Sequence, residues 1–448
     1  MVLQTNAIQG VKIAQVHNYY QQAGGEDGVV AAELELLRSH GHEVVTYYRS
    51  NTSIVGIWQL VLSGLRTLWN RETYRGFRKF LREEKPDVVH SHNTFPLISP
   101  ALHWACAREG VPIVQTLHNY RLLCLSAFLF REGASVEDSG SAAESNTCAK
   151  RDLTVGGGGK TGAVCELCLK KSFKWPGIRY SCYRGSRMGS GVAALMLLAH
   201  RILGTWSKKV SAYIALTEFQ KRKMVEGGFP EEKISVKPNF MEGEPVDQGG
   251  ERAVAVAHKP YALFVGRISP EKGCDVLVRA WGLFRSRMAA GELVGDPEAE
   301  LLIVGDGPER EILERLASSS GCDRVRFLGL QPKEEVLDLM RNAQFLVLPS
   351  VWYEGFPMTI VESFSCGTAV VATDDGGMQE IIREGHNGLK FGLGDFAQLA
   401  EKIDWAIGHP DEMKEMGWNA RQDFVEKYSA EKNYEMLMAV YEQALRCS

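Results

Sequence analysis

The 448-residue sequence has no apolar run as long as the roughly 18 residues that a membrane-spanning helix needs. Its longest candidate, residues 192–199, is followed directly by His200 and Arg201. Residues 1–10 show no basic segment followed by an apolar one, so the sequence does not indicate secretion. Ten cysteines are too sparse for a disulfide scaffold. We therefore expect a cytoplasmic protein, one that could touch the inner face of the plasma membrane.

An excess of positive charge is also missing. Lys and Arg number 51 against 55 Asp and Glu, a formal net charge of −4, which argues against coating nucleic acid through bulk charge. With 45% hydrophobic and 24% charged residues, the composition excludes a mainly disordered chain. Because one hydrophobic core rarely grows past about 250–300 residues, the length predicts at least two domains.

Short apolar runs separated by helical patterns predict two parallel sheets of α/β type. In the first half these runs lie at 11–17, 42–48, 87–90, 112–117, 213–216 and 235–240, and in the second half at 261–265, 301–304, 325–328, 345–348 and 369–372. We expect a first domain over 1–245 with a flexible insertion near 133–163, a linker over 246–260, a second domain over 261–428, and a final helix over 429–448 that packs back on the first domain.

Two cations follow the strand predicted at 261–265. Arg267 and Lys272 stand in the segment Gly-Arg-Ile-Ser-Pro-Glu-Lys-Gly that begins at Gly266. Open α/β sheets bind ligands at the carboxyl ends of their strands, and a guanidinium and an ammonium together suit a diphosphate. The segment therefore predicts a diphosphate site, with a solvated basic loop as the alternative.

The stretch from Pro349 to Glu362 combines a loop, a helix start and two carboxylates. Pro357 suits the first helical position, which puts Glu354 in the loop and Glu362 in the helix. Backbone amides at the helix start have no partner within the helix, so they form an anion site together with the helix dipole. Glu362 can accept hydrogen bonds from a ribose and Glu354 from another moiety, unless both are ordinary surface glutamates.

A further loop, with Gly305 and Gly307, follows the strand at 301–304. It could let the backbone approach a ligand closely, or it could form only a tight turn before a helix.

Taken together, these motifs resemble the donor-binding domain of the family 4 retaining glycosyltransferases, which have the GT-B fold of two Rossmann-like, doubly wound domains facing across a cleft. The resemblance covers nearly all of residues 261–390. It rests on Phe264-Val-Gly-Arg267, Glu271-Lys-Gly273, Val304-Gly-Asp-Gly-Pro-Glu309, Glu354-Gly-Phe356, Glu362, and Thr373-Asp-Asp-Gly-Gly377 with Glu380.

The first half resembles the same family less tightly. Gly24-Gly25-Glu26 matches its glycine loop, and Thr116-Leu-His-Asn119 matches a strand-end histidine that points into the cleft. Asn119 stands where the family often has Asp. The resemblance implies catalytic roles for Glu354, His118, Arg267 and Lys272, and donor binding by Gly24, Gly25, Gly266, Gly305, Gly307, Gly355, Phe356, Pro357, Met358, Thr359 and Glu362.

No Asp-x-Asp motif occurs in the chain. The GT-A fold usually holds a divalent metal with that motif. We therefore expect catalysis that needs no metal and no cofactor besides the nucleotide-sugar co-substrate, a UDP-, GDP- or ADP-sugar.

Four cysteines could hold a structural zinc, because Cys165 and Cys168 form a C-x2-C pair between Cys124 and Cys182. Reduced free cysteines are the alternative. Two basic and aromatic stretches, at 57–82 and 175–209, could bind an anionic membrane surface or could be helices packed on the sheet.

The sequence thus predicts an enzyme, a hexosyltransferase, that moves a sugar with retention of configuration onto a glycan or polyprenyl-linked acceptor, as in polysaccharide or cell-envelope biosynthesis. Nucleic acid is not an expected partner. A non-catalytic nucleotide-sugar-binding scaffold, a nucleotide-sugar epimerase and a glycan phosphorylase are the alternatives.

Overall fold

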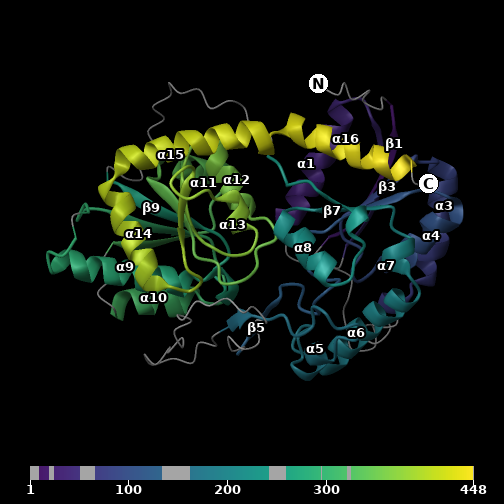
Figure 1. The fold of residues 1–448 in the computed structure, drawn as a ribbon, viewed down its shortest axis with the longest axis horizontal. Coiled ribbons are helices and arrows are strands. Elements are labelled where there is room, and N and C mark those ends of the chain that lie inside the picture. The colour runs from purple at the N-terminus through teal and green to yellow at the C-terminus, as the bar shows by residue number, and fades with distance from the viewer. Residues whose placement is uncertain are drawn as a thin grey trace. The chain divides into compact units, whose positions relative to one another are not determined.

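The computed structural model describes residues 10–19, 25–50, 66–133, 162–241, 259–293, 295–319 and 324–446. The chain divides into two compact units. Unit 1 comprises Met1–Phe128, Leu167–Glu242 and Ala430–Ser448, and unit 2 comprises Leu129–Glu166 and Gly243–Ser429. Each unit contains a six-stranded sheet with helices around it (Figure 1). The predicted α/β class with two Rossmann-like domains is therefore confirmed.

Unit 1 has a fully parallel sheet with the strand order β2-β1-β3-β4-β7-β8. Its strands are β1 (Lys12–Tyr19), β2 (Glu43–Ser50), β3 (Val88–Ser91), β4 (Ile113–Thr116), β7 (Ala212–Ala215) and β8 (Ile234–Val236). Its helices are α1 (Gly25–Ser39), α3 (Arg71–Glu84), α4 (Ala101–Glu109), α5 (Trp175–Arg179), α6 (Arg187–Ile202), α7 (Thr205–Lys208), α8 (Glu218–Glu226) and α16 (Ala430–Arg446), with a 3-10 turn η3 (Glu231–Lys233).

The last helix of the chain belongs to unit 1. In α16, Leu437 and Tyr441 are fully buried and pack in one core with Ile13 of β1 and Val114 of β4. The apolar stripe of this amphipathic helix is therefore what covers one face of the unit 1 sheet.

Unit 2 repeats the architecture with the strand order β11-β10-β9-β12-β13-β14. Its strands are β9 (Tyr261–Val265), β10 (Glu300–Val304), β11 (Val325–Gly329), β12 (Phe345–Leu348), β13 (Val370–Thr373) and β14 (Gly388–Phe391), besides a small antiparallel pair of β5 (Phe130–Glu132) and β6 (Gly162–Val164). Its helices are α9 (Cys274–Ala289), α10 (Arg310–Ser319), α11 (Lys333–Asn342), α12 (Met358–Ser365), α13 (Met378–Ile381), α14 (Phe396–Gly408) and α15 (Pro410–Asp423), with η4 (Pro270–Lys272) and a π-helical turn η5 (Phe424–Tyr428).

Three features of the fold differ from those expected. Residues 129–166 group with unit 2 rather than with the first domain, and β5 and β6 frame the insertion, most of which lies outside the described residues, as does most of the linker. β8 ends at Val236, because Pro238 lacks the amide that a longer strand needs. The sheet of unit 2 has a sixth strand, β14, whose four residues pair with β13.

Among the described helices, none is long and apolar enough to cross a membrane.

Candidate functional site

The strand order places one candidate site in unit 2. The order of its sheet reverses between β9 and β12, which pair directly through Ala262 and Leu263. From β9 the chain continues to one side of the sheet, and from β12 it continues to the other. Such a reversal leaves a crevice at the carboxyl ends of the strands, where open α/β sheets bind ligands. The loops that begin there contain Arg267, Lys272 and Glu354.

Two glycine positions let the loops of this edge lie against one another. Gly305 has a φ of +131°, and a Cβ built on it would lie 1.9 Å from the carbonyl oxygen of Gly266. Gly273 has a φ of +66°, and its Cβ would lie 2.0 Å from the carbonyl oxygen of Pro349. Only glycine fits such contacts. Backbone packing thus accounts for these glycines and joins the loop after β9 to the loops after β10 and β12.

An ion pair joins the loops after β9 and β12 across the reversal. Nζ of Lys272 donates to Oε1 of Glu354 over 2.6 Å, and Oγ of Ser350 donates to the same oxygen over 2.8 Å. The Glu354 residue is only 5% exposed. A buried carboxylate needs such partners, because losing its hydration is costly. The pair therefore fixes both side chains at the edge of the crevice.

Arg267 pairs with a different carboxylate. Its guanidinium forms an ion pair with Glu271, four residues further along the chain, and Oγ of Ser269 donates to the same Glu271 oxygen over 2.8 Å. The Arg267 side chain remains 53% exposed. Arg267 is thus held at its base and still reaches solvent.

The sequence analysis predicted that Arg267, Lys272 and Glu354 lie at the carboxyl ends of the strands, and the structure places all three at this edge of the unit 2 sheet. The sequence analysis did not identify Glu271 as the partner of Arg267, because Arg267 lies in a loop and Glu271 in a 3-10 turn, where no regular spacing pairs side chains.

The helix that follows β12 begins one residue later than expected. Pro357 is the N-cap residue of α12, and Met358 is its first residue. The Phe356 ring packs 5.8 Å from the Tyr428 ring and is nearly buried, so Phe356 offers a ligand its backbone rather than its side chain. Phe356 and Met358 are therefore placed to present amides at a helix N-terminus.

Glu362 lies further along α12. Burial raises the pKa of its carboxyl group, and the positive charge of Lys333 opposes that shift. A carboxyl group in this environment gains from hydrogen-bond donors such as hydroxyl groups.

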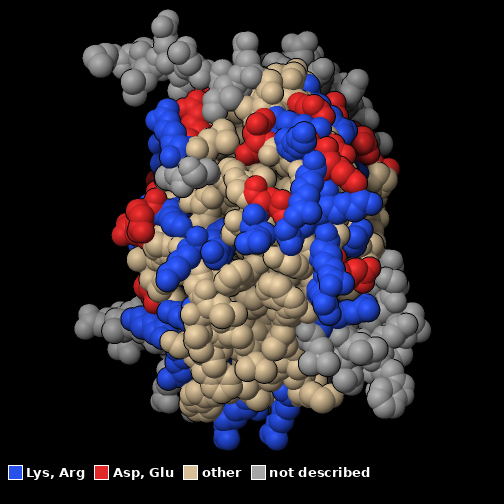
Figure 2. All heavy atoms as spheres, turned by 90° about the vertical axis from the view of Figure 1, so that its right-hand side faces the viewer, with Lys and Arg blue, Asp and Glu red and all other residues tan. Residues whose placement is uncertain are grey.

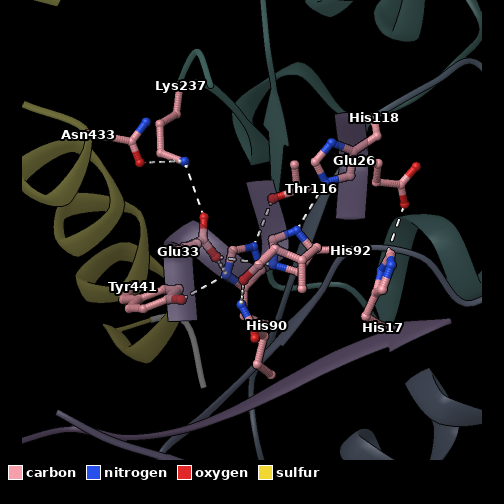
Figure 3. A network of polar contacts seen from close by, with 12 residues as sticks. His17, Glu26, Glu33, His90, His92, Thr116, His118, Lys237, Asn433 and Tyr441 are labelled. Atoms are coloured by element: carbon pink, nitrogen blue, oxygen red, sulfur yellow. Dashed lines mark hydrogen bonds and ion pairs between the residues drawn. The ribbon is translucent and has the colours of Figure 1, made fainter. Parts of the chain in front are cut away.

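A second candidate site lies in unit 1, at the ends of β3 and β4. A small pocket there is lined by residues that follow these two strands, His92, Asn93, Leu117, His118 and Asn119 among them, together with Arg121, Met196 and Trp206. His118 is half-buried, and its Nε2 lies 3.0 Å from Nδ1 of His92 (Figure 3). The strand-end position predicted for His118 thus places it at a pocket.

Behind His118 lies a buried polar network that sequence reasoning missed. Glu33 of α1 is 1% exposed and is surrounded by His90 and His92 of the β3 edge and by Lys237 (Figure 3). Burial alone would raise the pKa of Glu33, but the charges of His90, His92 and Lys237 hold it well below its usual value. A charged residue on the inner face of a predicted helix was the only available signal.

The glycine loop of unit 1 is described only in part. Gly24 lies outside the described residues, and Gly25 is the first residue of α1. The next residue, Glu26, is titratable near neutrality, because burial raises its pKa to about 8, with a contribution from Asp27 and opposition from Arg121.

Only one group in the described part of the chain brings three metal-ligand atoms within 4.8 Å of one another, namely Glu33, His90 and His92. Lys237 lies 3.4 Å from the same carboxylate and supplies positive charge there. The positive charge of Lys237 partly balances the carboxylate, although Oε1 of Glu33 and Nε2 of His92 are buried without a hydrogen-bond partner.

The predicted zinc ligands divide between the two units. Cys124, Cys168 and Cys182 lie in unit 1 and Cys165 in unit 2. Burial raises the pKa of Cys168 to about 12, with smaller contributions from the neighbouring Cys124 and Cys182. The zinc site stays a prediction.

Family models match both halves of the chain. The model described as "Glycosyl transferases group 1" matches residues 251–423, and the model described as "Glycosyltransferase Family 4" matches residues 23–135. The first match contains Arg267, Lys272, Glu354 and Glu362, and the second contains His118.

Curated relatives match over part of their length. A D-inositol 3-phosphate glycosyltransferase of Nocardia farcinica is 34% identical over 46% of this chain and 47% of its own. A phosphatidyl-myo-inositol mannosyltransferase of Mycobacterium leprae is 28% identical over 54% of this chain and 61% of its own. The chain thus spans about half the length of the curated relatives it matches.

Solved structures share the fold over nearly the whole chain. Sucrose-phosphate synthase of Thermosynechococcus elongatus gives a TM-score of 0.65 at 18% identity, covering 98% of this chain and 100% of its own. The Anabaena protein HepE, crystallised with UDP-glucose, gives 0.60 at 18% identity, covering 96% and 98%. With two Rossmann-like units and matches of both halves to glycosyltransferase models, the chain belongs to the family 4 glycosyltransferases and has the GT-B fold.

Proposed function

We propose that the protein transfers a hexose from a nucleoside-diphosphate sugar to a glycan or lipid-linked acceptor, with retention of configuration and without a metal. One observation carries the proposal. At the reversal point of the unit 2 sheet, Arg267 and Lys272 lie at the end of β9, beside the loop that leads from β12 to the N-terminus of α12. Two cations and a helix N-terminus at one strand edge are a site for a diphosphate.

Departure of the nucleoside diphosphate builds negative charge on the leaving phosphate. Arg267, Lys272 and the amides that precede α12 would stabilise that charge, and they need little rearrangement because carboxylates and glycine contacts already hold them. A divalent metal would otherwise neutralise this negative charge. We propose that no metal is needed because Arg267 and Lys272 supply fixed positive charge instead.

The other residues have roles at the donor and the acceptor. Glu362 would bind the ribose and Glu354, held by Lys272 and Ser350, would orient the donor sugar. His118 would accept a hydrogen bond from a hydroxyl of the sugar or the acceptor. The relative that acts on D-inositol 3-phosphate and the HepE structure with UDP-glucose support a nucleotide-sugar donor and a hydroxyl acceptor.

The proposal is tested by incubating the protein with UDP-, GDP- and ADP-sugars and following nucleotide release and product by mass spectrometry. Sugar transfer or donor hydrolysis supports it. A new free nucleotide sugar would instead show an epimerase, sugar phosphate released from a glycan with inorganic phosphate a phosphorylase, and binding without turnover a scaffold.

We expect Arg267→Ala and Lys272→Met each to lower kcat/KM for the donor. The decrease should correspond to a loss of about 2–4 kcal/mol of transition-state stabilisation, because each variant removes a charge-assisted contact to the leaving phosphate. Steady-state kinetics measures the effect. Lys390→Met is the matched control, since Lys390 is as buried as Lys272 and pairs with Asp374 over 2.9 Å. Wild-type kcat/KM in both folded site variants would contradict the placement.

A second prediction concerns the ribose. Glu362→Ala should weaken binding of the free nucleoside diphosphate by about tenfold, the effect of losing one or two hydrogen bonds to a charged acceptor. Isothermal titration calorimetry measures the affinity. Glu311→Ala, in the first turn of α10, removes a glutamate from another helix of unit 2 and should have no effect. An unchanged affinity in Glu362→Ala would rule out the ribose role.

A third prediction concerns the absence of a metal requirement for sugar transfer. We expect initial rates of transfer to stay nearly unchanged in EDTA, because Arg267 and Lys272 replace a divalent cation. Zinc content and circular dichroism are followed in the same sample, since a structural zinc bound by the cysteines would complicate the result. Complete loss of activity in a folded protein, restored by magnesium or manganese, is the opposite outcome.

A lipid-linked acceptor requires the protein to reach a membrane surface, and α6 offers a face for it. Met188, Leu195 and Ile202 follow one another at seven-residue intervals, so they lie on one side of this helix. They are 66%, 50% and 76% exposed, while the opposite side of α6 is buried in unit 1. An exposed apolar stripe of this kind suits the interface of a bilayer.

Basic residues surround this stripe. Lys170, Lys171, Arg179, Arg184, Arg187 and Lys208 are exposed on or beside α5, α6 and α7. Figure 2 shows the side of the molecule that is at the right of Figure 1, where Lys and Arg side chains border a broad uncharged area. Each such charge contributes about 1 kcal/mol near an anionic surface. We therefore propose reversible binding to anionic membranes through unit 1, with the protein on the cytoplasmic face.

The other stretch expected at a membrane has a different surface. The described part of residues 57–82 includes α3, in which Phe77 and Leu81 are buried in the core of unit 1. Its exposed face presents charges such as Arg71, Arg75 and Lys79 and no apolar stripe. This helix is packed on the sheet, so it could contribute charge but not insertion.

We expect the protein to float with liposomes that contain anionic lipid at low salt and to dissociate at high salt. Replacing Met188, Leu195 and Ile202 by Ser should abolish flotation, because the buried apolar area is lost. Replacing Trp418 and Val425, which are 54% and 52% exposed on unit 2, is the control and should change nothing. Absence of binding to anionic liposomes at low salt would indicate a soluble acceptor.

A further inference from the structure

Arg121 is held firmly at the pocket of unit 1. Its guanidinium carbon lies 5.0 Å from the centre of the Phe95 ring and 5.5 Å from the centre of the Tyr183 ring. The two rings contact each other edge to face, with their centres 5.6 Å apart, and Nη1 of Arg121 donates to the carbonyl oxygen of Leu125. Three segments thus hold one side chain, namely the loop after β3, the loop after β4 and the turn before α6.

The charge of Arg121 has no carboxylate beside it. Among the residues that the structure describes, Arg121 forms no ion pair, and its Nε and Nη2 donate no hydrogen bond. Arg267 and Lys272 differ in this respect, since each of them pairs with a glutamate. The charge of Arg121 does act on Glu26, but burial and the charge of Asp27 raise the pKa of Glu26 to about 8, so its carboxyl group is mostly uncharged at pH 7.

The pocket beside Arg121 is lined without negative charge. In the described part of unit 1 its lining residues include His92, His118 and Asn119, and none of them is Asp, Glu, Cys or Tyr. Imidazole is neutral or positive near neutral pH, never negative. Oδ1 of Asn119 accepts from the backbone amide of Arg121 over 2.9 Å, which leaves the two N–H groups of its Nδ2 as donors. Such a lining complements an anion.

The size of the pocket limits which anion fits. The cavity measures about 50 Å³. Because one water needs about 10–15 Å³ of such space, the cavity has room for roughly three or four water-sized groups. The three terminal oxygens of a phosphate ester match that room, whereas a sugar ring is larger. A guanidinium is a planar fork of donors that suits phosphate oxygens.

We infer that the pocket of unit 1 binds a phosphate group of the acceptor, and that Arg121 selects acceptors that carry one. His118 lines the same pocket, so the hydroxyl that receives the sugar would lie beside this phosphate. A phosphorylated sugar and the diphosphate that links a sugar to a lipid share this chemistry. The acceptor rests on the proposed function, whereas binding of phosphate at Arg121 does not.

Arg222 provides a matched control. Its guanidinium carbon lies 5.8 Å from the centre of the Phe219 ring in α8. It is therefore another arginine of unit 1 that stacks on an aromatic ring, and it does not line the pocket.

Phosphate binding is tested without sugar transfer by nitrogen-15 NMR of the arginine-labelled protein. The side-chain Nε–Hε signal of Arg121, assigned by its absence in Arg121→Gln, should shift and saturate as inorganic phosphate is added. Sodium chloride at the same ionic strength should leave it unchanged, because screening by salt does not replace a directed contact. The signal of Arg222, assigned with Arg222→Gln, should shift with neither salt.

Activity gives the second readout, with the nucleotide sugar that the donor screen selects. Hexose 6-phosphates and a polyprenyl-diphosphate hexose are compared with free hexoses as acceptors, and we expect a phosphate-bearing acceptor to be preferred. Arg121→Gln should raise KM for that acceptor by about 10- to 100-fold, the effect of losing hydrogen bonds to a charged group. Donor hydrolysis without acceptor should stay unchanged. Arg121→Lys should recover part of the loss, since it keeps the charge but not the fork, and Arg222→Gln should lose nothing.

The two readouts separate this inference from the proposed function. If no nucleotide sugar is turned over, the proposed function fails, and the NMR titration still decides whether phosphate binds at Arg121. If transfer occurs, preference for the polyprenyl diphosphate indicates an acceptor in the membrane, and preference for a hexose phosphate indicates a soluble one.

Three results would overturn the inference. One is an Arg121 signal that inorganic phosphate leaves in place, and another is an equal shift of the Arg222 signal, which would show unspecific binding. The third is an Arg121→Gln variant, folded by circular dichroism, that uses phosphate-bearing and free acceptors in the wild-type ratio of kcat/KM.

Discussion

The ion pair between Lys272 and Glu354 is the contact on which the proposed donor site depends. It joins the loop after β9 to the loop after β12, the two strands between which the sheet of unit 2 reverses its order. The 2.6 Å contact is strengthened by Ser350 and protected from water by the burial of Glu354. The close approach of Gly273 to Pro349 leaves no room for another side chain between the loops. In the proposed function, Lys272 would meet a leaving phosphate from a fixed position, and little of the stabilisation would be lost to ordering it.

The two units place their charged groups differently. In unit 2 the charged groups lie at the surface of the crevice, each cation with one carboxylate. In unit 1 the charges lie in the interior, where Glu33 and Lys237 are both about 1% exposed and histidines extend from them toward the pocket. The first arrangement suits binding of a charged group, whereas the second leaves the charges beneath the pocket and out of reach of solvent. The proposed division into donor and acceptor sides is consistent with this difference.

The parallel sheets and the ligand-bearing strand ends could be predicted from the sequence, because apolar runs and the loops that follow them are local patterns. Arg267, Lys272 and Glu354 were found in this way, since each stands in the segment that follows a strand. Glu33, His92 and Lys237 could not be found, because the order of the sheet, not the spacing in the chain, brings them together. The same holds for membrane contacts. The sequences of α3 and α6 are both amphipathic. Only the structure shows that Phe77 of α3 is buried in the core while Ile202 of α6 is exposed to solvent.

The central claim is that the edge between β9 and α12 binds the nucleoside diphosphate of a sugar donor. A crystal structure of the protein grown with a nucleoside diphosphate, selected by the donor screen, tests it most directly. The account predicts diphosphate oxygens within hydrogen-bonding distance of Arg267 and Lys272, and a ribose hydroxyl on Glu362. A nucleotide bound elsewhere on the molecule, with Arg267 and Lys272 still paired only to Glu271 and Glu354, would contradict it.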